Sequence, residues 1–220
     1  VNSVQQKTNT NNTEYDLTLI NEMKSYPNIY YSLIKSFCPT IYGHDIVKAG
    51  ILLGLIGGSA KNLSDNQLFA KQVICFCLVI LELVNPTSQV CCIVITSQVY
   101  VNATATSTSG LTVTVNRENN DQYLEAGALI LSDNGICAID EFDKVSDSSS
   151  LLEAMEQQTI SIAKAGVICQ LKCRVGIIAS ANPINGCYNR AKTFKDNTKI
   201  SNAILSRFDL IFLLVDKADP

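Results

Sequence analysis

Residues 135–144 place the tightest constraint on the fold of this chain. The stretch from Ile136 to Ile139 is apolar at every position and leads directly into Asp140 and Glu141. A short run of this kind is typical of a strand buried on both faces, as in a parallel sheet covered by helices. The strand is expected to present two carboxylates at its tip, a pair that suits a hydrated Mg²⁺ and an attacking water. Taken alone, the pattern fits two solvated acids equally well.

Strand patterns and helix patterns alternate along the rest of the chain. Asp45 is expected to cap one helix, and Ser150 with Glu153 to form a capping box for another. The alternation predicts an α/β fold in which helices flank a parallel sheet. The predicted strands cover residues 73–81, 98–101, 175–181 and 210–215, and the predicted helices cover residues 16–23, 29–37, 46–55, 150–158 and 201–207.

Two polar connections predict β-hairpins inserted into this fold. Short polar or glycine-containing segments between two strand patterns are typical of hairpin turns. The polar stretch 59–67, in contrast, is expected to be a loop. The first hairpin has residues 112–115 and 122–124 around the segment 116–121, and the second has residues 159–162 and 167–171 around the segment 163–166, which carries Lys164 at its tip.

Composition favours one folded domain preceded by a flexible segment. A chain of 220 residues that is 47% hydrophobic can bury one substantial core. Residues 1–14 are rich in Asn, Gln and Thr, which cannot repay the entropy of ordering, so we expect a flexible lead-in to a domain over residues 15–220. The formal net charge of -3 argues against a grip on nucleic acid over the whole surface, so any such contact must come from local basic residues.

Cysteine usage and hydropathy argue against two other classes of protein. The nine cysteines mostly lie within apolar runs, as reduced thiols do, and the pairs Cys75-x-Cys77 and Cys169-x-x-x-Cys173 have no second pair at zinc-like spacing. Neither a disulfide framework nor a zinc site is therefore expected. Residues 73–81 form the longest apolar run, about half of the ~20 residues that a membrane-spanning helix requires. We expect a soluble intracellular protein.

Eight short motifs occur in a fixed order between residues 41 and 209. They are Ile41-Tyr-Gly-His44 with Val47-Lys48, Gly57-Gly58, Leu124-Glu-Ala-Gly-Ala-Leu129, Ile139-Asp-Glu-Phe-Asp-Lys144, Glu153-Ala-Met-Glu-Gln-Gln158, Ala163-Lys-Ala-Gly166, Ala181-Asn-Pro183 and Leu205-Ser-Arg-Phe-Asp209. This set resembles the AAA+ motor domain of the minichromosome maintenance (MCM) helicase family. Residues 106–115 and 188–192 are most similar to the eighth branch of that family, which is associated with homologous recombination. The resemblance covers about residues 29–217 and lacks the family's amino-terminal DNA-binding domain and carboxy-terminal lid, so we expect an incomplete AAA+ core.

The resemblance implies an ATP site shared between the subunits of a ring. Asp140 and Glu141 match the Walker B pair, in which the first acid supports Mg²⁺ and the second orients the attacking water. Asn182 matches the sensor-1 amide, and Arg207 matches the arginine finger that reaches the nucleotide of the neighbouring subunit. From the residues alone, Asn182 also fits a turn, and Arg207 also fits a surface pair with Asp209.

The resemblance also implies contacts with DNA and with adenine. Lys164 matches the hairpin lysine that grips the DNA backbone in the ring channel, and residues 116–121 match the helix-2 insert. Phosphate contacts give affinity without sequence readout, as a translocating motor needs, although Lys164 also fits a solvated hairpin tip. Ile41, Tyr42 and Gly43 match the segment that cups adenine. The implied cofactors are ATP and Mg²⁺, the implied partners are DNA and other MCM subunits, and the implied location is the nucleus.

The chain departs from the family at the phosphate-binding loop. The family places Gly-Asp-Pro-Gly-x-x-Lys-Ser after its first buried strand, where backbone N–H groups cradle the phosphates and the lysine neutralises their charge. The corresponding residues 82–90 keep Pro86 but contain no glycine and no lysine, and no Gly-Lys pair occurs anywhere in the chain. Ser88 aligns with the Mg²⁺-binding hydroxyl of the family. Loss of the loop is expected to weaken nucleotide binding by several kcal/mol.

The sequence leaves three functions open. The first is a subunit of an ATP-dependent DNA helicase that acts in replication or homologous-recombination repair. The second is a catalytically impaired ring subunit that keeps Arg207 for its neighbour's site. The third is a module like the sigma-54 activators that works on protein, which the Lys164 hairpin and the insert at 112–123 disfavour. The missing loop has two explanations, a degenerate paralogue or an error of gene prediction across residues 62–90.

Overall fold

The computed structural model divides the chain into two compact units. The first unit is Val1–Thr40 and the second is Ile41–Pro220. The described part of the first unit is helical, and the second unit contains the sheet. The structure describes residues 14–39, 41–58, 61–62, 68–69, 75–80, 99–118, 121–145, 149–164, 167–186 and 188–215.

Two helices make up the described part of the first unit. Helix α1 spans Glu14–Lys24, and helix α2 spans Ile29–Ser36. Asn28 caps α2, because its side-chain oxygen accepts a hydrogen bond from the Tyr31 N–H at 3.3 Å. Both helices predicted for this region are confirmed, with ends that differ by one or two residues, as is usual for helix boundaries.

Helix α3 spans Asp45–Ile56 near the start of the second unit. The predicted cap at Asp45 is wrong, since Asp45 is the first helical residue and the cap position is held by His44, which makes no side-chain cap bond. The Asp45 charge still lies in the first turn, where it complements the helix dipole. The helix ends at Gly57 as its sequence indicates, because the left-handed φ of 71° is available to glycine and its N–H donates to the Leu53 carbonyl at 3.0 Å.

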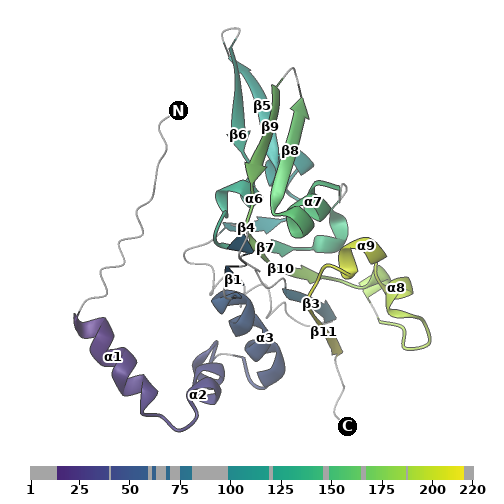
Figure 1. The fold of residues 1–220 in the computed structure, drawn as a ribbon. Coiled ribbons are helices and arrows are strands. Elements are labelled where there is room, and N and C mark those ends of the chain that lie inside the picture. The colour runs from purple at the N-terminus through teal and green to yellow at the C-terminus, as the bar shows by residue number, and fades with distance from the viewer. Residues whose placement is uncertain are drawn as a thin grey trace. The chain divides into compact units, whose positions relative to one another are not determined.

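A five-stranded sheet forms the centre of the second unit (Figure 1). All four of its strand pairings are parallel, which confirms the predicted α/β fold with a parallel sheet flanked by helices. The side chains of β7 and β10 are buried almost throughout, as the apolar runs predict. The strands lie in the order β11 (Leu210–Val215), β3 (Cys75–Ile80), β10 (Gly176–Ala181), β7 (Ile136–Asp140) and β4 (Val99–Asn102).

Two antiparallel hairpins project from the same end of this unit (Figure 1), which confirms the predicted inserts. The first consists of β5 (Val113–Glu118) and β6 (Asp121–Ala126), and the second of β8 (Thr159–Lys164) and β9 (Val167–Lys172). The first hairpin is longer than predicted, because residues 116–118 and Asp121 continue the ladder on its two strands. Its Asn116 side chain donates to the Glu125 carboxylate across the strands at 2.8 Å, so polar residues extend a solvated ribbon.

Short elements account for most of the remaining differences from the predicted fold. The predicted loop at 59–67 contains strand β1 (Lys61–Asn62), which pairs with β2 (Leu68–Phe69). The predicted capping box is wrong, since Ser150 lies inside a helix that begins at Ser149, and the Glu153 carboxylate accepts bonds from the Ser161 N–H and hydroxyl at 2.8 and 2.6 Å. The helix predicted over 201–207 is shortened to α9. The short helices are α5 (Thr108–Leu111), α6 (Ala128–Leu131), η1 (Phe142–Lys144), α7 (Ser149–Gln157), η2 (Ile184–Gly186), α8 (Phe194–Asn197) and α9 (Asn202–Leu205).

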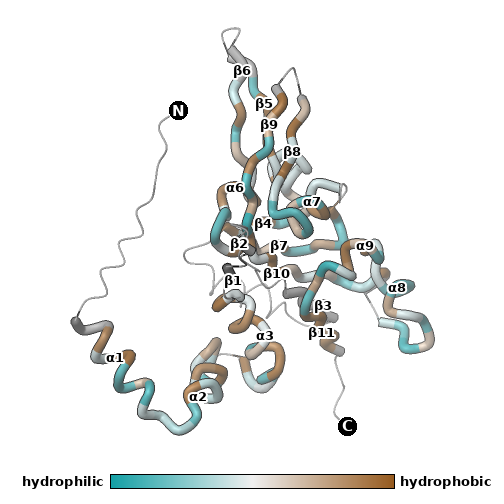
Figure 2. Tube along the Cα trace, in the orientation of Figure 1, coloured by the Kyte–Doolittle hydropathy of each residue, from teal (hydrophilic) through white to brown (hydrophobic). Residues whose placement is uncertain are grey.

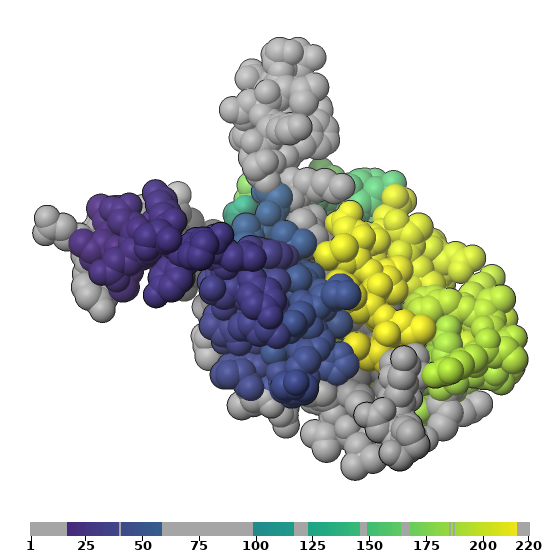
Figure 3. Space-filling model, turned by 90° about the horizontal axis from the view of Figure 1, so that it is seen from below, coloured from purple at the N-terminus to yellow at the C-terminus, as the bar shows by residue number. Residues whose placement is uncertain are grey.

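The core of the second unit lies between the sheet and its covering elements. Helix α3 contacts β3 and β10, and it lies beside the carboxy-terminal segment of the described chain (Figure 3). Gly50 permits this packing, because a Cβ at this position would overlap the Phe212 ring of β11. Hydrophobic residues predominate along α3 and hydrophilic residues along α8 (Figure 2). The side chains with almost no exposure are Leu129, Ile139, Leu151, Ile160, Ile177, Cys137 and Cys173. Among the described helices, none combines the length and the apolar content that a membrane crossing requires.

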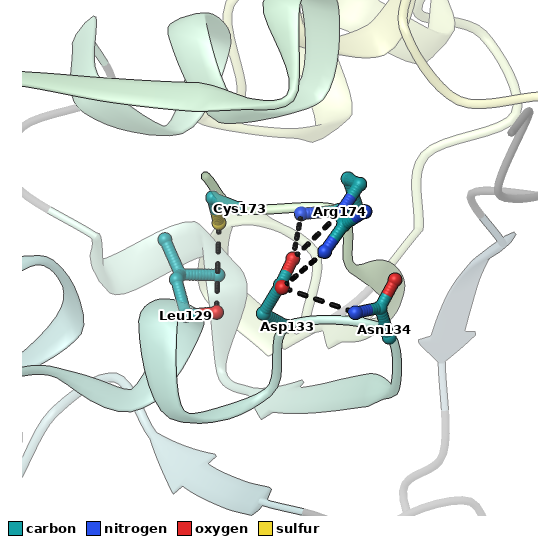
Figure 4. A network of polar contacts seen from close by, with 5 residues as sticks. All are labelled: Leu129, Asp133, Asn134, Cys173 and Arg174. Atoms are coloured by element: carbon teal, nitrogen blue, oxygen red, sulfur yellow. Dashed lines mark hydrogen bonds and ion pairs between the residues drawn. The ribbon is translucent and has the colours of Figure 1, made fainter. Parts of the chain in front are cut away.

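An ion pair connects the segments that lead into β7 and β10 (Figure 4). The Asp133 carboxylate accepts bonds from the Arg174 backbone N–H at 2.8 Å and from its guanidinium at 2.7 and 3.2 Å. Asn134 adds a side-chain bond to Asp133 at 3.1 Å, and its N–H donates to the Arg174 carbonyl at 2.8 Å. Since Arg174 lies two residues after the end of β9, this network attaches the base of the second hairpin to the central sheet.

Candidate active site

Three of the predicted site residues meet at the carboxyl edge of the sheet. Strand β7 ends at Asp140, which Glu141 follows, and Asn182 comes directly after the adjacent strand β10. Ile139 pairs with Ala179, so the two strands end at nearly the same level. Because parallel strands present their carboxyl ends at one edge, where open α/β sheets bind their ligands, these side chains share one site.

The Asp140 carboxylate is held by groups from three positions. Its Oδ1 atom accepts a hydrogen bond from the Ser180 hydroxyl of β10 and another from the Glu141 N–H at 2.9 Å. Its Oδ2 atom accepts a bond from the Tyr100 hydroxyl of β4 at 3.0 Å. These bonds fix the carboxylate between the two strands that flank β7.

The acidic loop after β7 also binds the segment that carries the amide. Glu141 has a left-handed φ of 53°, unusual for a residue other than glycine, and η1 begins directly after it. The Asp143 carboxylate accepts a bond from the Asn182 N–H at 3.1 Å and pairs with Lys144 at 3.3 Å. Its side chain is only 5% exposed. The sharp turn at Glu141 therefore brings Asp143 back to hold Asn182 beside the acidic pair.

Arg207 lies on the surface, in the turn that follows α9. Its guanidinium pairs with the Glu156 carboxylate of α7 at 2.7 Å, and both side chains remain about half-exposed. The sequence also allowed an ion pair of Arg207 with Asp209, but the ion-pair partner in the structure is Glu156. The next residue, Phe208, packs edge to face against Phe142 of η1 with ring centroids 5.8 Å apart. This aromatic contact ties the Arg207 segment to the acidic loop, while the guanidinium itself stays accessible.

The segment predicted to cup adenine lies just before α3. The buried ammonium group of Lys48 donates to the Ile41 carbonyl at 2.6 Å and so closes the segment against the helix. Gly43 has a left-handed φ of 72°, and the Tyr42 side chain is 99% exposed. No hydrogen bond or ion pair within the described chain joins these residues to Asp140, Glu141 or Asn182. Their predicted role stays a prediction.

The structure describes one of the three other predicted contact residues, Lys164. Lys164 is the last residue of β8 and pairs with Val167 across the hairpin, so it adjoins the residues that connect the two strands. Pro86 and Ser88 lie outside the described residues. The roles predicted for these three residues therefore stay predictions.

The residues at the carboxyl edge fit a magnesium ion better than a metal held by protein alone. Across the described residues, no three His, Cys, Asp or Glu side chains gather into a metal-binding group. Magnesium prefers oxygen ligands and usually takes only one or two carboxylates, with water and phosphate oxygens completing its shell. Asp140 and Glu141 provide carboxylates of this kind, and they lie at the edge where open α/β sheets bind their ligands.

Three residues that support this site were not predicted from the sequence. Tyr100 and Ser180 bind Asp140, and Asp143 binds the Asn182 backbone. Ser180 stands two positions before Asn182 in a buried strand, a place where a hydroxyl needs a partner, so a signal was present. Tyr100 becomes relevant only through the pairing of β4 with β7, which no local pattern reveals.

This fold, a parallel sheet flanked by helices, is that of a P-loop NTPase-like domain. The MCM P-loop domain model matches residues 16–220, and the chain belongs to the MCM family. The match confirms the resemblance that the ordered motifs indicate.

Individual relatives agree with this assignment and with the predicted eighth branch. The chain is 49% identical over 207 residues to DNA helicase MCM8 of Xenopus laevis and 48% identical over 207 residues to DNA helicase MCM8 of Homo sapiens. It is 44% identical over 215 residues to probable DNA helicase MCM8 of Oryza sativa subsp. indica. The matches cover 91 to 94% of this chain but only 25 to 27% of each relative, so the chain spans about a quarter of their length.

Proposed function

We propose that this chain is the AAA+ motor part of a subunit of an ATP-dependent DNA helicase. The observation that supports it best is the grouping of Asp140, Glu141 and Asn182 at the carboxyl edge of a five-stranded parallel sheet, in a chain of the MCM family. Two carboxylates beside an amide are the groups that phosphoryl transfer to water needs, because that reaction depends on positioning and electrostatics. The relatives named DNA helicase MCM8 agree with this class of activity.

Each residue has a separate task in this proposal. Bound Mg²⁺ would neutralise charge on the phosphates. Asp140 holds the ion or its water, Glu141 orients the attacking water, and Asn182 donates its amide to the terminal phosphate. Arg207 serves the site of the neighbouring subunit, which requires a ring or another oligomer of MCM subunits. Its position on the surface, where its ion-pair partner among the described residues is the half-exposed Glu156, supports a role outside its own subunit.

The DNA contact in this proposal is the β8–β9 hairpin. Lys164 stands beside the connection between its strands, where a cation reaches the phosphate backbone without reading bases. The network at Asp133 and Arg174 attaches the base of this hairpin to the sheet that carries the acidic pair. We further propose a nuclear role in homologous-recombination repair or replication, to which the likeness to MCM8 proteins lends support.

A second candidate is a ring subunit that does not hydrolyse ATP in its own site. The absence of glycine and lysine from residues 82–90 favours it, since the family's phosphate-binding lysine has no counterpart at that place in the chain. Such a subunit would keep Arg207 for its neighbour's nucleotide. Both candidates share the fold, the hairpins and the arginine, and they differ in whether this chain binds MgATP.

Equilibrium binding of a fluorescent ATP analogue to the purified chain, with and without Mg²⁺, separates the two candidates. The helicase proposal predicts saturable binding that Mg²⁺ strengthens, and loss of this strengthening in Asp140→Asn. Glu141→Gln should bind as the unmodified chain does but hydrolyse at least 100-fold more slowly, because it loses the group that activates water. Undetectable binding at millimolar MgATP would remove the helicase proposal for this chain and leave the second candidate.

A further inference from the structure

The hydrogen bonds of Asp140 leave one of its oxygens only partly occupied. A carboxylate oxygen accepts about two hydrogen bonds. The Oδ1 atom already receives two, from the Ser180 hydroxyl and from the Glu141 N–H. Among the residues that the structure describes, the Oδ2 atom receives one, from the Tyr100 hydroxyl at 3.0 Å. The remaining acceptor position therefore lies on Oδ2, and Tyr100 determines the direction in which it points.

We propose that Tyr100 is a positioning residue that aims Oδ2 of Asp140 at the magnesium ion. The proposal rests on the proposed function, because it concerns the metal of that same site. Asp140 then offers the ion or its water one oxygen only. The Tyr100 hydroxyl excludes a second ligand from its side of Oδ2, and Ser180 and the Glu141 N–H exclude the ion from Oδ1.

The placement of Tyr100 suits this task better than a purely structural one. It lies on β4, the edge strand that pairs with β7. Asn102 and Asp140 form the last residue pair between these two strands. The Tyr100 side chain is 39% exposed, so the ring is not a main component of the core. The bond between its hydroxyl and the Asp140 carboxylate is exposed to solvent, from which a hydrated ion approaches.

The chemistry of the pairing explains why a phenol is useful at this position. A hydrogen bond to a ligating carboxylate fixes its rotation, and loss of such a partner typically lowers metal affinity about 10- to 100-fold. A phenol donates one bond and is held by a rigid ring, so it fixes direction with few rotatable bonds. The Tyr100→Phe variant removes the hydroxyl alone and keeps the ring.

The experiment titrates Mg²⁺ into the 220-residue chain at a fixed concentration of a fluorescent ATP analogue, and repeats the binding in EDTA. Tyr100→Phe should raise the Mg²⁺ concentration at half-maximal effect about tenfold or more. It should leave binding in EDTA and the thermal midpoint unchanged, since the nucleotide contacts and the core are intact. Tyr123→Phe is the matched control, because this tyrosine of β6 is similarly exposed at 46% and makes no described contact with Asp140. It should behave as the unmodified chain does.

Each outcome decides the proposal. If Tyr100→Phe and the unmodified chain share one Mg²⁺ midpoint, the role of Tyr100 is refuted while the proposed function stands. If Tyr100→Phe weakens binding equally with Mg²⁺ and in EDTA, Tyr100 is structural and the proposal is again refuted. If the unmodified chain shows no Mg²⁺-dependent binding, the proposed function fails, and the positioning role fails with it. A tenfold shift confined to the Mg²⁺ titration supports the proposal.

Discussion

Asp133 is a residue outside the candidate site whose removal should lower the stability of the fold. Its carboxylate accepts three bonds from Arg174 and one from the Asn134 side chain, and it is only 26% exposed. Asp133→Ala should lower the free energy of unfolding by about 1–3 kcal/mol, because the Arg174 and Asn134 donors then lose their acceptor. Chemical denaturation measures the change. Glu22→Ala, an exposed acid on α1, is the control and should stay within about 0.5 kcal/mol of the unmodified chain.

The Asp133 pair also predicts how this stability depends on pH. Burial, the largest single effect, raises the pKa of Asp133, but the hydrogen bonds and the charge of Arg174 together lower this pKa below its ordinary value of 3.8. The contribution of Asp133 is therefore fully present above pH 3.8 and is lost as pH falls through the lower pKa of the folded state. The stability difference between the unmodified chain and Asp133→Ala should shrink only in that acidic range. A difference that shrinks near neutral pH would contradict this account.

Two buried thiols should be chemically protected in the folded chain. Burial raises the pKa of both Cys137 and Cys173 to about 12. Because the thiolate is the reactive form, iodoacetamide at pH 8 should label these two cysteines far more slowly than the partly exposed Cys169. Mass spectrometry of native and denatured samples checks the order. Equal labelling of the three thiols in the native chain would show that this part of the core opens readily.

At the scale of the elements, Gly127 connects the first hairpin to α6 through a close backbone approach. A Cβ there would lie 2.6 Å from the carbonyl oxygens of Gly110 and Thr112, and the Gly127 N–H donates to that Thr112 oxygen at 2.7 Å. Gly127→Ala should therefore lower the free energy of unfolding by about 1–3 kcal/mol through overpacking. Gly110→Ala is the control, since its Cβ would meet only the movable side chains of Thr106 and Ser107. A smaller loss in Gly127→Ala than in Gly110→Ala would refute the close-approach argument.

The elements that could be predicted from the sequence are those with a strong local signal. Strands β7 and β10 follow from continuous apolar runs, and α3 follows from its glycine stop. Helices of four residues, such as α5 and α6, are too short to show a helical period. The prediction of the capping box was wrong because α7 begins before Ser150 and Glu153 binds Ser161 of β8. That contact is tertiary and cannot be read from the sequence around α7.

The residues of the candidate site also fall into those that the sequence predicts and those that it does not. Asp140, Glu141 and Asn182 stand at strand ends, so their meeting at one edge follows from the parallel fold once the strands are recognised. The bond from Tyr100 to Asp140 and the ion pair of Arg207 with Glu156 join residues 40 and 51 positions apart (140 − 100 and 207 − 156). Such contacts depend on register and on the packing of helices over the sheet, which the sequence does not display.

At the scale of the whole molecule, a site completed by a neighbour's arginine requires more than one chain. Arg207→Ala and Glu141→Gln should each abolish ATP hydrolysis, whereas a mixture of the two variants should recover part of it. Recovery is expected because some interfaces then pair an intact Glu141 with an intact Arg207. Loss of the surface ion pair with Glu156 costs little stability, so Arg207→Ala should fold normally. A mixture as inactive as its components would place Arg207 outside the neighbour's site.

The overall charge of the molecule determines how it should bind DNA. With a net charge of -3, the chain offers no general attraction to phosphates, so binding should depend on few local contacts and should weaken only moderately with salt. Lys164→Ala should reduce affinity similarly for all sequences. It should also lower the slope of log affinity against log salt by about 0.7 for a single strand, the share of one phosphate contact. Fluorescence anisotropy with two unrelated oligonucleotides over a range of salt concentrations measures both quantities. Lys172→Ala, an exposed lysine at the opposite end of the same hairpin, is the matched control and should change neither. If both lysine variants lose affinity equally, the contact is spread along the hairpin and does not depend on its tip.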